Sequence, residues 1–141
     1  MNLHLLWLLW VRGGDIACLI VCIWAFWRGG PVEKRGAAII LVGWIASFFL
    51  TLAGKGPVMG VVIIDTAACM LFAVLAIWSR RVWAFFATAS LLNAVASHFI
   101  SDLAKLGVYG YATNSGFWSG WALLICLAFG ILGYRRSLRP K

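Results

Sequence analysis

The sequence is poor in charged residues, and poorest in acidic ones. Only 11% of its 141 residues are charged, with four Asp and Glu in all, whereas 64% are hydrophobic. A soluble domain has roughly 25% charged and 45–50% apolar residues, and a fold of this size could not hide so much apolar surface from water. These proportions exclude a water-soluble domain, and we expect lipid to be the solvent for most of the chain.

Familiar enzyme and cofactor motifs are also missing. The sequence has no glycine-rich phosphate loop, no HExxH or GxSxG motif, no CxxCH haem-attachment motif and no CxxC pair. The N-terminus lacks the basic region of a signal peptide, so we expect it to be retained. We therefore predict a non-enzymatic protein with no cofactor, apart from bound lipid.

Five apolar segments predict an all-α integral membrane protein, a single domain of five transmembrane helices over residues 1–141. At a rise of about 1.5 Å per residue, 17–23 residues cross a hydrocarbon core of about 30 Å. The predicted spans are 14–27, 37–53, 58–78, 82–104 and 116–134.

The first span is short, and two interpretations of residues 1–12 stay open. They either extend the span as a longer tilted helix or form an interfacial helix, with a bend at Gly13-Gly14. We favour the interfacial helix slightly, because Arg12 and Asp15 are costly far below the interface. A bundle of four spans plus an interfacial N-terminal helix is the alternative architecture.

The basic residues predict the orientation, with the N-terminus outside and the C-terminus inside. Cytoplasmic loops carry the excess of Lys and Arg. On one side of the predicted membrane lie only Arg12, Lys55 and Lys105. The other side holds Arg28, Lys34, Arg35, Arg80, Arg81, Arg135, Arg136, Arg139 and Lys141. We predict a bacterial-type inner membrane and a basic cytoplasmic tail, 135–141, whose Arg and Lys side chains contact lipid head groups. These small basic groups do not indicate nucleic-acid binding.

A polar cluster interrupts the fourth apolar segment. Asn93, His98 and Asp102 fall on one half of a helical wheel, opposite an apolar half. In the predicted topology they lie in the outer half of the membrane, at a depth similar to that of Asp65 and Asp15. Ionisable residues at membrane depth normally face the bundle interior, so we expect Asp65 to bond His98, Asn93 or a neighbouring hydroxyl.

Three interpretations of this cluster remain open. It is polar glue between helices, a proton- or ion-handling site that includes a weakly supported metal site of His98, Asp102 and Asp65, or a catalytic dyad. A Ser-His-Asp triad built on Ser97 or Ser101 fails, because neighbours on one helix cannot act as nucleophile, base and orienter.

Two GxxxG spacings predict close helix packing: Gly56 with Gly60, and Gly116 with Gly120. The short connections leave no aqueous domain, so we favour an accessory or scaffold subunit of a larger membrane complex. Its partners would be lipids and other membrane subunits or further copies of itself. The alternatives are an oligomeric pore or a proton- or cation-coupled transporter, and an intramembrane enzyme acting on lipid or quinone.

Overall fold

A computed structural model describes residues 3–52, 57–103 and 113–138, and every element within these ranges is a helix. The expectation of an all-helical bundle is confirmed. The elements are α1 (Leu3–Arg28), α2 (Pro31–Leu52), α3 (Pro57–Ser79), α4 (Val82–Leu103), the π-helical segment η1 (Phe117–Ala122) and α6 (Leu123–Ser137).

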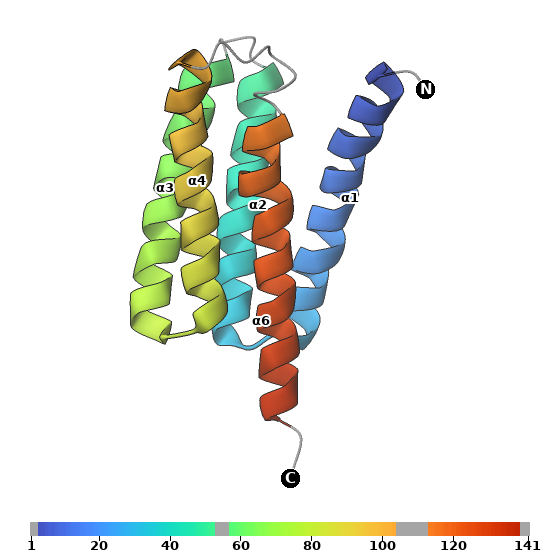
Figure 1. Cartoon of the computed structure of the whole chain (residues 1–141). Coiled ribbons are helices and arrows are strands. Elements are labelled where there is room, and N and C mark those ends of the chain that lie inside the picture. The colour runs from blue at the N-terminus through green and yellow to red at the C-terminus, as the bar shows by residue number, and fades with distance from the viewer. Residues whose placement is uncertain (1–2, 53–56, 104–112, 139–141) are drawn as a thin grey trace.

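The helices pack in a ring in which each contacts its neighbour in sequence, and α1 closes the ring against α6 (Figure 1). The end of α1, the start of α2, the α3–α4 turn and the end of α6 lie at one end of the bundle, which we call the basic end. Toward its N-terminus α1 leans away from the other helices (Figure 1).

Three helices are long and apolar enough to cross a membrane: Met59–Ser79, Val82–Ile100 and Thr113–Ser137. They match the predicted spans 58–78, 82–104 and 116–134 closely. Large apolar side chains point outward around the bundle, as Trp27, Met59 and Ile77 do. An outward apolar surface of this extent indicates a membrane protein.

The bend expected at Gly13-Gly14 is absent, because α1 continues unbroken through both residues. Aromatic rings occupy the space that the glycine side chains leave. A Cβ atom at Gly13 would lie 3.7 Å from Trp121, and one at Gly14 would lie 3.6 Å from Trp44. The glycine pair therefore admits indole rings against α1 instead of breaking the helix.

The second helix starts six residues before the predicted span 37–53. Pro31 occupies its first position and Glu33 lies in its first turn. Proline fits the first helical position because its missing N–H has no partner to lose there, and an acid near a helix start is favoured by the helix dipole. The apolar run marks where hydropathy rises, whereas these two residues mark where the helix begins.

Small side chains let the helices approach closely at the centre of the bundle. The fully buried positions there include Cys18, Cys22 and Ala25 of α1, Ala37 of α2, and Ala84 and Ala87 of α4. All four cysteines are free thiols. They serve as small packing residues, and Cys18 also lines a cavity.

Candidate functional site

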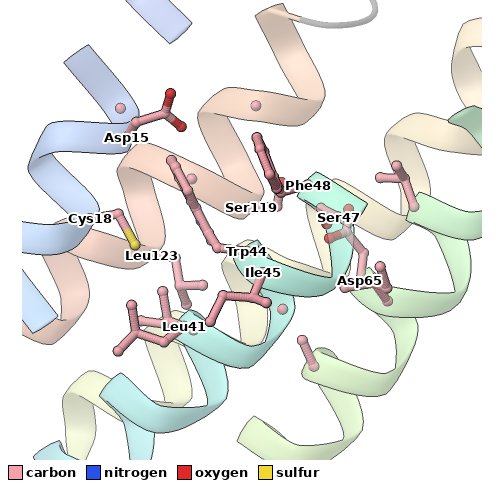
Figure 2. A pocket seen from close by; sticks show the side chains of 18 of the residues that line it. Asp15, Cys18, Leu41, Trp44, Ile45, Ser47, Phe48, Asp65, Ser119 and Leu123 are labelled. Carbon is pink, nitrogen blue, oxygen red and sulfur yellow. The ribbon is translucent and has the colours of Figure 1, made fainter. Parts of the chain in front are cut away.

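A cavity of about 960 Å³ lies between α1, α2, α3 and η1, away from the basic end. Its walls are mainly apolar, and polar groups come from Asp15, Ser47, Asp65 and Ser119 (Figure 2). Ligand cavities in proteins measure about 300–1,000 Å³ and combine apolar walls with a few placed polar groups. This cavity has both properties, and we call it the outer cavity.

The outer cavity opens sideways. Leu19 of α1 and Phe48 of α2 line it and are themselves 56% and 60% exposed. The opening therefore lies along the flank of the bundle, where α1 leans away (Figure 1). In a membrane protein this flank faces lipid.

Asp65 and His98 form a buried pair at the wall of the outer cavity. His98 Nε2 and Asp65 Oδ2 lie 3.0 Å apart, and both residues are buried. This hydrogen bond joins α3 to α4. Asp65 itself lines the cavity. The pair therefore offers a polar group to a molecule inside.

Asp15 lies across the outer cavity from this pair and does not join it. It belongs to α1, with Trp44 of α2 between it and Asp65 in the view of Figure 2. Its Oδ2 lies 3.7 Å from Arg12 Nη1, and both side chains are substantially exposed. Neighbouring opposite charges reduce the cost of placing either one near the membrane, and this pair lies at the mouth of the cavity.

The expectation that Asn93 shares the Asp65–His98 cluster does not hold. Its side chain is exposed on the surface of α4. Asn93 and His98 are five positions apart on α4, so their side chains point about 140° apart around the helix axis. One face of the helix therefore cannot present both side chains to Asp65. Instead, Ser97 Oγ donates to the Asn93 carbonyl oxygen and accepts from Asn114 Nδ2 at 2.8 Å.

The weakly supported metal site of His98, Asp102 and Asp65 stays a prediction. The described residues contain no group of three His, Cys, Asp or Glu side chains placed to hold a metal ion. The side chain of Asp102, the third expected ligand, lies outside the described residues.

The three GxxxG glycines that the structure describes, Gly60, Gly116 and Gly120, lie within the bundle. A Cβ atom at Gly60 would meet Leu50 at 2.8 Å, so α3 approaches α2 closely there. Gly116 lies near Trp10, and buried Gly120 lines the outer cavity with open space beside it. Gly56, Arg139 and Lys141 lie outside the described residues, whereas Arg135 and Arg136 are exposed at the end of α6.

A second buried carboxyl, that of Glu33, lies at the basic end. Glu33 is 1% exposed, and Trp83 Nε1 donates to its Oε1 at 3.0 Å. Its Oε2 is buried without a partner. Pro31, two residues before Glu33, indicates in the sequence where α2 starts. No local sequence pattern indicates that Glu33 bonds Trp83, fifty positions later.

No protein-family model, curated protein or solved structure matches the chain.

Proposed function

We propose that the protein crosses a bacterial-type inner membrane five times, with its N-terminus outside and its C-terminus in the cytoplasm. The charge distribution supports this topology. Arg28, Lys34 and Arg35 lie at the basic end, together with the Arg80-Arg81 turn and the Arg135-Arg136 pair. Of the described basic residues only Arg12 lies elsewhere, and the excess of basic residues marks the cytoplasmic side.

Within this topology we propose that the protein binds a membrane-soluble amphiphile in the outer cavity. The ligand has an apolar body and one uncharged group that both donates and accepts hydrogen bonds, such as the hydroxyl of a long-chain alcohol or isoprenoid. The observation that carries the proposal is Asp65, bonded to His98, on the wall of a mainly apolar cavity that opens sideways.

The chemistry of that wall favours a neutral head group over a charged one. A carboxyl oxygen accepts a hydrogen bond from a ligand hydroxyl, and the buried surroundings disfavour bringing in an unpaired charge. The apolar walls match a hydrocarbon body, and the ligand reaches them from the bilayer without crossing water.

Quenching of tryptophan fluorescence by a dibrominated stearyl alcohol tests the proposal, because Trp44 and Trp121 line the outer cavity. The purified full chain in mild detergent should show saturable quenching. Gly120→Leu should abolish the saturable part, since a side chain there enters open space inside the cavity and leucine suits a helix better than glycine. Asp65→Asn should weaken binding about tenfold, the upper value for one ordinary hydrogen bond.

Gly133→Leu is the matched control. A side chain at Gly133 also enters open space, but at the basic end, so it should leave the quenching unchanged. Equal saturable quenching in Gly120→Leu and the unmodified protein would show that the outer cavity is not the binding site.

The other roles expected from the sequence stay predictions. An accessory subunit needs a partner-facing surface, and the described GxxxG glycines face inward instead. A proton- or cation-coupled transporter would use the same Asp65–His98 pair, and an intramembrane enzyme acting on lipid or quinone would use the same outer cavity.

A further inference from the structure

A second hollow lies at the opposite end of the molecule. A groove of about 720 Å³ runs between the start of α4 and the end of α6, and we call it the inner groove. Apolar side chains such as Phe86 and Phe129 form most of its walls, and Arg80 and Arg81 lie at its end. Gly133 leaves open space along it, because a Cβ atom there would meet nothing within 4 Å.

The guanidinium groups of Arg80 and Arg81 have no carboxylate partner among the described residues. The two described ion pairs, Arg12 with Asp15 and His98 with Asp65, lie toward the outer cavity. The one acid at the basic end, Glu33, is buried and bonded to Trp83. No carboxylate in the described ranges therefore compensates the positive charge of Arg80 and Arg81.

Arg80 also has an unusual backbone conformation. Its φ angle is 53°, and no other described non-glycine residue has a positive φ. Its N–H donates to the Ala76 carbonyl oxygen at 2.9 Å and so ends α3. Glycine is the usual residue at such a helix end, so an arginine side chain is held there against the local backbone preference. Residues in unfavourable backbone conformations cluster at binding sites.

We propose that the inner groove binds an anionic diacyl phospholipid from the leaflet at the basic end. Its phosphate contacts Arg80 and Arg81, and one acyl chain lies along Phe86 and Gly133. Guanidinium groups form strong hydrogen bonds with phosphate, and the apolar walls continue from the charged end into the depth of the membrane. The charge selects an anionic lipid over a zwitterionic one.

Native mass spectrometry of the full chain, titrated with phosphatidylglycerol or phosphatidylcholine, tests the proposal. Phosphatidylglycerol should remain bound preferentially. Arg80→Gly and Arg81→Gln should each weaken its binding about tenfold, as expected for loss of one charge-assisted contact. Because glycine adopts the positive φ readily, Arg80→Gly keeps the α3–α4 turn and separates loss of binding from loss of fold. Gly133→Leu should also weaken binding, since its side chain fills the groove.

Two controls keep the test specific. Lys34→Gln removes one exposed positive charge at the same end but outside the inner groove, and Gly120→Leu fills the outer cavity; both should leave phosphatidylglycerol binding within about twofold of the unmodified protein. Equal retention of the two lipids would overturn the proposal. So would unchanged binding in Arg80→Gly or Gly133→Leu, or an equal loss in Lys34→Gln.

Discussion

At the scale of single residues, the Glu33–Trp83 hydrogen bond gives the clearest prediction about stability. Trp83→Phe removes the donor and leaves a carboxyl that is 1% exposed without its described partner. An unsatisfied buried polar group costs about 1–3 kcal/mol, so this variant should lower the unfolding free energy by that amount. Denaturant titration in detergent micelles, followed by circular dichroism, measures the loss.

Glu33→Met provides the matched background, because it replaces the carboxyl with an apolar side chain of similar length. In that background Trp83→Phe should cost less, since no carboxyl is left to satisfy. Equal costs in both backgrounds would mean that ring packing against Phe72, 6.2 Å away between centroids, accounts for the whole effect.

The polar residues also show how far a single sequence predicts contacts. Asp65 and His98 could be placed at one depth, because both follow from counting residues along apolar segments, and they lie 3.0 Å apart. Asn93 could not be placed as reliably. The helical wheel of α4 has a polar half, but the neighbouring helices cover only part of it. His98 lies in the covered part, and Asn93 lies in the exposed part. Glu33 was missed because its partner depends on how α2 meets α4, which no local pattern encodes.

At the scale of the helices, Trp83 of α4 is held between two glycines. Cβ atoms at Gly36 and Gly130 would lie 2.7 Å and 2.8 Å from its indole ring. Gly130→Ala should therefore overpack the α4–α6 contact and destabilise the protein by about 1–3 kcal/mol. Gly133→Ala, three residues later on the same helix, should be neutral or stabilising, because its methyl group meets open space. Melting temperatures in detergent distinguish the two, and equal melting temperatures would contradict the packing argument.

Helix boundaries followed from the sequence where charge and hydropathy change together, as at the Arg80-Arg81 turn. The predicted boundaries were wrong where charge and hydropathy change at different residues. The start of α2 lies in a charged stretch, and α1 passes through Gly13-Gly14 because aromatic rings from elsewhere pack on the glycines. A glycine pair can mark either a bend in a helix or a place where another side chain packs closely on it. Only the side chain that packs on the glycines distinguishes the two cases.

At the scale of the whole molecule, the proposed topology predicts where each terminus lies. Green fluorescent protein fused after Lys141 should fluoresce, because it folds in the cytoplasm, whereas alkaline phosphatase at the same position should be inactive. A phosphatase fused before Met1 should be active. The reverse pattern in bacterial cells would show the opposite orientation, and activity of one reporter at both ends would rule out an odd number of spans.

Because the outer cavity opens sideways, its occupancy depends on the concentration of ligand within the membrane. A ligand that enters from the flank competes with every neighbouring acyl chain, so its effective concentration is its mole fraction in the leaflet. Diluting the membranes in buffer would then leave the cavity as full as before. Adding unrelated lipid to the same bilayer would empty it.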